Sequence, residues 1–243
     1  MTVADLDRKL YPRYEDNWDD EWFREAILQS LSSDMNVLDV GAGAGIVSQM
    51  NFRGMVRKVC GVDLDPRVTD NPHLDEGRVA SAETLPYADG TFDLVFSDNV
   101  LEHLDAPETV FREVNRVLRS GGRFLIKTPN RFHYVPLIAT LTPHSVHRWV
   151  NKRRGRDVDD TFPTRYRANS ERKLKKLAAE CGFRIHRLQL IEGRPEYLRF
   201  NALTYYLGWV YERVVNAFEL LRSFRVLIIA EFVKTENSPN RGS

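Results

Sequence analysis

Short apolar runs alternate with helix-like segments over the first half of the chain. The runs that read as strands are Val37–Val40, Val59–Asp63, Arg78–Ala80, Phe92–Phe96 and Phe124–Ile126. After Pro107, apolar residues at 110, 114, 117 and 118 share one helical face, and Gly121-Gly122 is expected to end that helix. Strands that alternate with helices indicate an α/β fold: a Rossmann-like, mostly parallel sheet with helices on both faces.

Both ends of the chain extend this pattern. Three acids at 19–21 begin a helix, and the polar stretch Leu6–Tyr14 before it reads as an arm whose Tyr11 and Tyr14 either face solvent or close over a ligand. A helix from Asn169 to Gly182 and a strand over Phe183–Ile191, with a shift of phase inside it, follow later. The final strand is predicted at 226–233.

An aromatic-rich helical stretch, Leu198–Leu221, precedes that last strand. One of its faces carries five apolar residues at helical spacing: Leu203, Tyr206, Leu207, Val210 and Val214. We favour the interpretation that this face covers the edge of the sheet. The alternatives are an apolar wall for a lipid acceptor and a homodimer contact.

The length of 243 residues favours a single domain over 1–243, with an N-terminal cap arm and helix over 1–33. Residues 131–169 have no clear period and contain Pro136, Pro143 and Pro163. Long irregular inserts in compact domains are typically functional, so we expect a substrate lid here.

The net charge is +1 but is unevenly spread. Residues 1–120 hold 12 Lys+Arg and 23 Asp+Glu, whereas residues 121–243 hold 23 and 11. The excess concentrates in Arg148–Lys176, with eleven basic residues against four acids. This block is either a solvated face or an attractor for a phosphate, a nucleotide-linked sugar or an anionic lipid surface. No nucleic-acid recognition motif is interleaved with the block, so nucleic-acid binding is not expected.

Two cysteines, Cys60 and Cys181, fall in a predicted strand and on a predicted helix face, which indicates buried thiols in a reducing compartment. The first residues lack a secretory pattern, and the longest aliphatic run near the end, Val226–Ala230, is too short to cross a bilayer. A cytoplasmic protein is expected, with peripheral contact at the inner membrane face left open. No Cys/His cluster has zinc-site spacing, so no metal is expected.

The first predicted strand ends in three glycines on alternate positions, Gly41, Gly43 and Gly45. Glycine accepts backbone angles that other residues resist and lets a ligand approach the main chain closely. Asp63 ends the second strand beyond this turn, at the spacing from Gly41 where a carboxylate can bind ribose hydroxyls. A plain tight turn, and a helix cap before Pro66, are the structural alternatives for these two features.

The other strand ends carry polar residues as well: Ser81–Glu83, Ser97–Asn99 and Thr128–Asn130. In open parallel sheets, ligands bind beyond the carboxyl ends of the strands. Five strand ends that converge on one crevice are a more specific signal than any single motif.

The spacing Gly-x-Gly-x-Gly, with Gly61–Asp65, Ala82–Tyr87, Phe92–Leu104, Glu113–Phe124 and Thr128–Asn130 in this order, resembles class I S-adenosylmethionine-dependent methyltransferases over the part of the chain that ends at Asn130. The resemblance implies a seven-stranded sheet with an antiparallel last strand and S-adenosylmethionine as cofactor.

The resemblance also implies roles for individual residues. The three glycines make room for the methionine half of the cofactor, above Asp39. Asp63 binds the ribose and Leu64 flanks the adenine, whose edge is lined by Ala82 and Glu83. Ser97 and Asn99 lie near the sulfonium. Relatives commonly have Asp at the position of Ser81, whose hydroxyl is a weaker partner for the adenine amine.

Methyl transfer to a hydroxyl benefits from a general base, for which His103 is the first candidate and His144 the second. A capping or core-edge histidine and a loop histidine are the respective structural alternatives. Glu102 either orients a histidine or faces solvent. The segments 128–134 and 160–164 resemble methyltransferases of bacterial surface-glycan and glycolipid pathways, which implies O-methylation of a sugar-containing or other small hydroxylated acceptor. The basic block suits a phosphorylated, nucleotide-linked or lipid-linked sugar. The alternatives are a quinone, phenol or nitrogen acceptor, and a non-catalytic cofactor-binding protein.

Overall fold

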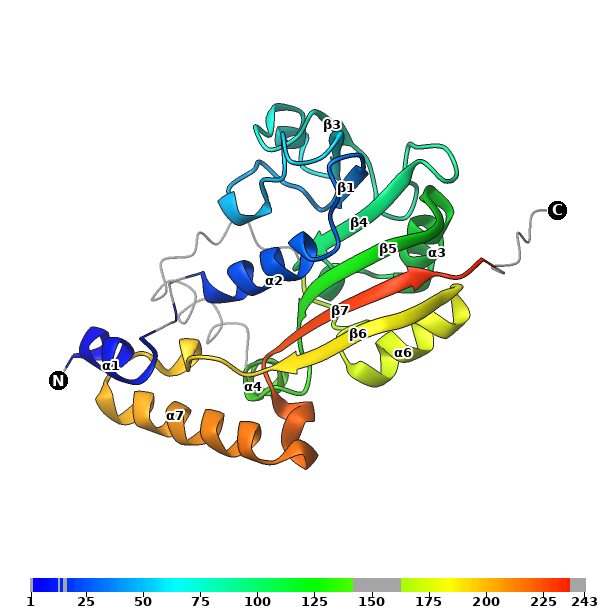
Figure 1. Ribbon diagram of the computed structural model, residues 1–243. Coiled ribbons are helices and arrows are strands. Elements are labelled where there is room, and N and C mark those ends of the chain that lie inside the picture. Colours follow the sequence, from blue (N-terminus) through cyan, green and yellow to red (C-terminus); the bar gives the residue numbers. More distant parts are fainter. Residues whose placement is uncertain (1, 13, 15–16, 142–162, 237–243) are drawn as a thin grey trace.

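A seven-stranded sheet forms the centre of the computed structural model, which describes residues 2–12, 14, 17–141 and 163–236 (Figure 1). The strand order is β3-β2-β1-β4-β5-β7-β6, and β7 runs antiparallel to both of its neighbours. The strands are β1 Asn36–Val40, β2 Lys58–Asp63, β3 Glu76–Val79, β4 Phe92–Asp98, β5 Leu118–Pro129, β6 Phe183–Ile191 and β7 Leu227–Lys234. The α-helices of the described residues are α1 Val3–Leu10, α2 Trp18–Leu28, α3 Pro107–Val117, α4 Tyr134–Leu141, α6 Glu171–Glu180 and α7 Ala202–Ala217.

Alternation along each strand builds two cores. In β5, Phe124 and Ile126 enter the core shared with α3 and α6, whereas Leu125 enters the core shared with α2. Figure 1 shows α2 on one side of the sheet and α3 with α6 on the other. The predicted fold class, with its antiparallel last strand, is confirmed. The predicted phase shift in the sixth strand is also present, as a register shift between Ile185 and Arg187.

One local prediction was wrong. The helix after Pro107 ends at Val117, before Gly121-Gly122, because Leu118 is already extended and pairs with Phe92 of β4. Two other segments have local structure that the sequence analysis did not specify. The segment after the glycine turn forms a 3₁₀ turn, Ser48–Met50. The N-terminal arm begins with helix α1, which Thr2 and Asp5 stabilise with a reciprocal capping box.

The stretch 131–169 contains α4, although the sequence showed no period there. Residues 142–162 of the expected lid lie outside the described residues. Cys60 and Cys181 are both buried free thiols. Among the helices that the structure describes, none combines the length and apolar character that a bilayer span requires.

Helix α7 corrects the favoured interpretation of its apolar face. The five residues predicted to cover the sheet edge are all exposed: Leu203, Tyr206, Leu207, Val210 and Val214. The buried face is instead formed by Tyr205, Gly208, Glu212 and Val215. The helix packs on α1 and on neighbouring 3₁₀ turns at the end of the sheet (Figure 1).

Candidate active site

The glycine turn after β1 adopts a backbone that only glycine accepts readily. Gly41, Gly43 and Gly45 have φ angles of 87°, 51° and 74°. A Cβ on Gly41 would lie 2.2 Å from Val100 Cγ2, so the segment after β4 packs directly on this turn. Around Gly43, by contrast, the nearest atom to an added Cβ would be Asp63 Oδ2 at 3.9 Å. The turn is therefore closed on one side and roomy at its centre, as a site for close approach of a ligand requires.

Asp63 holds the glycine turn from β2. Its Oδ2 accepts a hydrogen bond of 2.8 Å from the Gly43 amide, and its Oδ1 accepts one of 2.9 Å from the Asp65 amide. A carboxylate offers about four lone-pair positions, so both oxygens can still accept from a ribose hydroxyl pair. Asp63 thus has the placement that the sequence predicted, with a second task in shaping the turn.

Asn71 is a contributor that sequence reasoning missed. Its buried side chain donates to the carbonyl oxygens of Ala42 at 2.9 Å and Gly43 at 3.2 Å. Its Oδ1 accepts from the His73 amide, which fixes the orientation of the amide group. In the sequence, the Asn71-Pro72 pair predicts only a break between elements, and no local signal indicates that this side chain returns to the glycine turn.

Three carboxylates gather where β1, β2 and β4 end. Asp39 is buried, and burial together with the negative charges of Asp98 and Asp63 raises its pKa well above the usual range. Burial raises the pKa of Asp98 to about 6, although Lys127 at 3.0 Å opposes this rise. Lys127 already compensates the charge of Asp98, whereas the repulsion between Asp39 and its two neighbours favours a ligand with an ammonium or sulfonium group.

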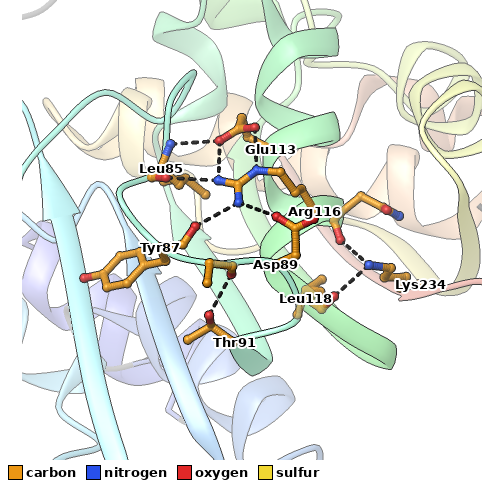
Figure 2. Close-up of polar contacts among 10 residues, drawn as sticks. Leu85, Tyr87, Asp89, Thr91, Glu113, Arg116, Leu118 and Lys234 are labelled. Carbon is orange, nitrogen blue, oxygen red and sulfur yellow. Dashed lines mark hydrogen bonds and ion pairs between the residues drawn. The ribbon is translucent and has the colours of Figure 1, made fainter. Parts of the chain in front are cut away.

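The residues predicted to contact the adenine are accessible to a ligand. Leu64 is largely exposed, Ala82 is half-buried, and the Glu83 amide donates to Ser81 Oγ at 3.1 Å. Figure 2 shows how the following loop is fixed: Arg116 of α3 donates to the carbonyl oxygens of Leu85 and Tyr87. Glu113 pairs with Arg116 at 2.8 Å and raises its pKa. This network holds the segment behind Ser81–Glu83 in place.

Two predicted residues at the end of β4 have different environments. Ser97 is buried and donates to the Val40 carbonyl oxygen at 2.9 Å, so its hydroxyl joins β4 to the residue before the glycine turn. Asn99 is exposed and has a φ of 51°. Its backbone N–H donates to the Lys127 carbonyl oxygen. Asn99 is therefore the one whose side chain is open to a ligand.

His103 lies on the 3₁₀ turn Leu101–His103, which follows β4. Its Nδ1 is 3.2 Å from the Pro163 carbonyl oxygen. Because a carbonyl only accepts, the proton of the neutral ring belongs on Nδ1, and Nε2 carries the lone pair of a base. Nε2 lies 4.0 Å from Glu102 Oε1. The ring thus has the tautomer that a general base at Nε2 needs.

Glu102 is buried, which excludes the interpretation that it faces solvent. Burial raises its pKa to about 7. Its Oε2 accepts from Thr128 Oγ1 at 3.1 Å, and Thr128 Oγ1 accepts from Asn169 Nδ2 at 2.6 Å. A hydrogen-bonded chain from the end of β5 therefore fixes the carboxyl group beside His103. The second candidate base, His144, lies outside the described residues.

A cavity of about 800 Å³ lies between α1, the start of α2 and the β6–α7 connection. Its size is within the range of small-molecule sites. Its wall includes Tyr11, Tyr14, Gln49, Arg194 and Arg199. Tyr11 is buried and donates to Glu212 Oε2 at 3.0 Å, and Tyr14 packs on Trp18 with ring centroids 5.5 Å apart. The two tyrosines are thus parts of a packed wall, and neither is a free surface aromatic.

Comparison with known proteins gives a family match: residues 38–126 match a family described as a methyltransferase domain. A sarcosine/dimethylglycine N-methyltransferase of Halorhodospira halochloris is 36% identical over 137 residues, which are 52% of this chain and 46% of that protein. The chain thus spans about half the length of the curated relatives it matches.

Two solved structures share the fold. An S-adenosylmethionine-dependent methyltransferase from Methanosarcina mazei superposes with a TM-score of 0.55 and 21% identity, over 86% of this chain and 97% of that one. Geranyl diphosphate C-methyltransferase from Streptomyces coelicolor, solved with Mg²⁺, geranyl diphosphate and S-adenosyl-L-homocysteine, gives 0.56 and 16%, over 92% and 86%. The comparisons thus show a methyltransferase-domain match over residues 38–126 and a fold shared with two solved methyltransferases. Two of the three proteins named here are named for different methylated atoms, nitrogen and carbon, and none is named for a glycan.

Proposed function

We propose that this protein is an S-adenosylmethionine-dependent methyltransferase that methylates a hydroxyl group of a small, sugar-containing acceptor. The observation that carries the proposal is the glycine turn held by Asp63 beside the carboxylates of Asp39 and Asp98. The open glycine backbone fits the methionine half of this cofactor, and the Asp63 carboxylate fits its ribose. The negative charge of the neighbouring carboxylates fits its sulfonium group. The match over residues 38–126 supports the same conclusion.

The residues present divide the work between binding and proton transfer. Gly43, Asp63 and Asn99 would hold the cofactor, which supplies an already activated methyl group when bound. His103 would orient the acceptor hydroxyl and take its proton at Nε2, while Glu102 stabilises the resulting imidazolium. Since the methyl donor needs no further activation, alignment and exclusion of water are the protein's main contributions.

The acceptor is proposed to enter the cavity lined by Tyr11, Tyr14, Arg194 and Arg199. Aromatic rings favour the faces of a sugar or another ring, and guanidinium groups favour phosphate or carboxylate. Arg199 donates to Asp7 Oδ2 at 2.5 Å and to Glu196 Oε2 at 3.0 Å, so its guanidinium group is held in place before any acceptor arrives. The proposal that the acceptor is phosphorylated rests on the basic second half of the chain.

A nitrogen acceptor is the second candidate, because one relative at 36% identity is named as an N-methyltransferase. An amine that is already neutral needs no base. The effect of a His103 substitution on turnover therefore separates the two acceptor types, and an acceptor screen with sugar nucleotides, glycolipids, phenols and amines, read by mass, identifies the product.

Calorimetry tests the cofactor assignment. We expect S-adenosylmethionine and S-adenosylhomocysteine to bind the purified chain and NAD not to bind. Asp63→Asn should weaken binding roughly 10–100-fold, because one hydrogen bond to a charged group contributes about 1.5–3 kcal/mol. Asp70→Asn, on an exposed turn outside the site, is the matched control and should bind like the parent. Binding of NAD alone would refute the assignment.

A further inference from the structure

The proposed function leaves unused an exposed apolar face on α7 and the segments next to it. Among the described residues, nine of the eighteen exposed large apolar side chains lie between Phe200 and Phe224, about a tenth of the chain. Leu203 is 72% exposed and Leu207 is 61% exposed. We call this surface the α7 stripe; it consists of Phe200, Leu203, Tyr206, Leu207, Val210, Val214, Phe218, Leu220 and Phe224.

The α7 stripe is not the incidental result of a loosely packed helix. Hydrogen bonds hold the opposite face of α7 against the N-terminal residues. Tyr205 donates to Asp7 Oδ1 at 2.7 Å, and the buried Glu212 accepts from Tyr11. A capping box formed by Asn201 and Thr204 fixes the first turn. The helix is thus held rigidly with its apolar side outward, which is the arrangement of an interaction surface.

Positive charge borders the stripe where it meets α6. Lys175 and Arg222 both pair with Glu171, and Arg222 also pairs with the exposed Glu219. Ser223 shares a pocket wall with Arg172 and Lys175, so three basic residues face two acids at this border. Arg172 and Lys175 are both exposed, as is Phe132 on the same wall. Arg213 of α7 is 55% exposed and pairs with the buried Glu212 at 3.2 Å. A second copy of the chain would bring an equally basic border against this one, whereas an anionic surface would complement it.

From this placement we infer that the α7 stripe docks the protein on the surface of an anionic lipid bilayer. A helix with Leu, Tyr and Val on one face, with phenylalanines before and after it and basic residues of α6 near its end, resembles interfacial membrane-binding helices in composition. The basic border supplies attraction to anionic headgroups, and the apolar side chains enter the headgroup boundary. Docking would bring the end of the sheet that carries α7 toward lipid-linked acceptors (Figure 1).

Vesicle flotation of the full chain tests this inference. We expect binding to vesicles of phosphatidylcholine mixed with phosphatidylglycerol, and at least tenfold weaker binding to phosphatidylcholine alone. Leu203→Gln with Leu207→Gln should reduce binding to anionic vesicles ~10-fold or more, because two buried leucines are lost from the contact. Leu28→Gln, a matched exposed leucine on α2, should not change it.

Charge reversal supplies a second, independent readout. Arg172→Glu with Lys175→Glu should weaken binding to anionic vesicles on the order of 20-fold or more and reduce its dependence on salt, at about fivefold per removed charge. Absence of binding to any vesicle would overturn the inference. So would a dimer, seen by light scattering, that the Leu203 and Leu207 changes dissociate, since the stripe would then be a contact between copies.

Discussion

At the scale of single residues, the proposed chemistry depends on one histidine and the groups that fix it. Pro163 sets the tautomer of His103 through Nδ1, and Glu102 lies beside Nε2. Thr128 and Asn169 in turn hold Glu102, so residues from distant parts of the sequence together define one proton acceptor. Such supporting partners matter because a base must be oriented before it can act.

His103→Ala is expected to lower turnover on a hydroxyl acceptor about 10²–10⁴-fold, the usual contribution of a positioned base. The affinity for S-adenosylmethionine should change little, because His103 is not among the predicted cofactor contacts. Steady-state kinetics and calorimetry on the same sample check both statements. His186→Ala, an exposed histidine on β6, is the control. Unchanged turnover on the hydroxyl acceptor would remove His103 as the base.

At the scale of elements, a buried lysine joins α2 to the centre of the sheet. Lys127 of β5 is fully buried and pairs with Asp98 of β4 and with Asp19 and Asp20 of α2. Burial lowers its pKa, but the three carboxylates outweigh this and keep the pKa raised. The first turn of α2, which borders the cavity proposed for the acceptor, is therefore fixed by charge as well as by its apolar face.

Lys127→Met should destabilise the fold by about 2–4 kcal/mol at pH 8, because three partly buried carboxylates lose their counter-charge. The pKa of Asp98, about 6 in the parent, should rise further in the variant. A carboxyl pKa raised above its unfolded value means that stability is present at low pH and lost as pH rises. The loss should therefore be smaller at pH 5 than at pH 8 in urea unfolding.

Lys58→Met is the matched control for this change. Lys58 pairs with Glu76 at 2.5 Å on the surface, where such pairs contribute about 0–1 kcal/mol. An equal effect of the two substitutions, or a loss at Lys127 that does not depend on pH, would contradict the role assigned to the buried lysine.

At the scale of the whole molecule, the sheet gathers negative charge at one point of its carboxyl edge. Asp39, Asp63 and Asp98 come from three strands that are neighbours only in the folded protein. Burial and their mutual repulsion raise the pKa of Asp39, and a cationic cofactor would lower it again. Cofactor binding should therefore be linked to proton release.

We expect S-adenosylmethionine to bind more tightly as pH rises, because Asp39 must lose its proton to accept the cation. At one pH, calorimetric heats in phosphate and in Tris should differ by the number of protons released multiplied by the difference between the ionisation enthalpies of the two buffers. Asp39→Asn should remove this difference, and S-adenosylhomocysteine, which lacks the sulfonium charge, should reduce it. Equal heats in both buffers for the parent protein would disprove the linkage.

The sequence by itself determined the α/β class, the positions of most strands and helices, and the strand ends at which polar residues gather. Strand-forming runs of period two, helix faces of period 3.6 and glycines at a turn are local signals, so they survive in a single chain. The predicted cofactor residues Gly41, Gly43, Asp63 and Asn99 all lie at strand ends for this reason. Their role as cofactor contacts stays a prediction.

Only the tertiary structure decided what depends on partners distant in the sequence. In the folded protein, Asn71 hydrogen-bonds to the glycine turn and Thr128 donates to the buried Glu102. Helix α3 ends early because Leu118 pairs with β4. The tertiary structure also reversed the expected orientation of α7: periodicity shows that a helix has an apolar face, but not whether that face meets the protein. Which face is buried depends on the neighbours, here Asp7 and Tyr11, and these are brought to α7 only by folding.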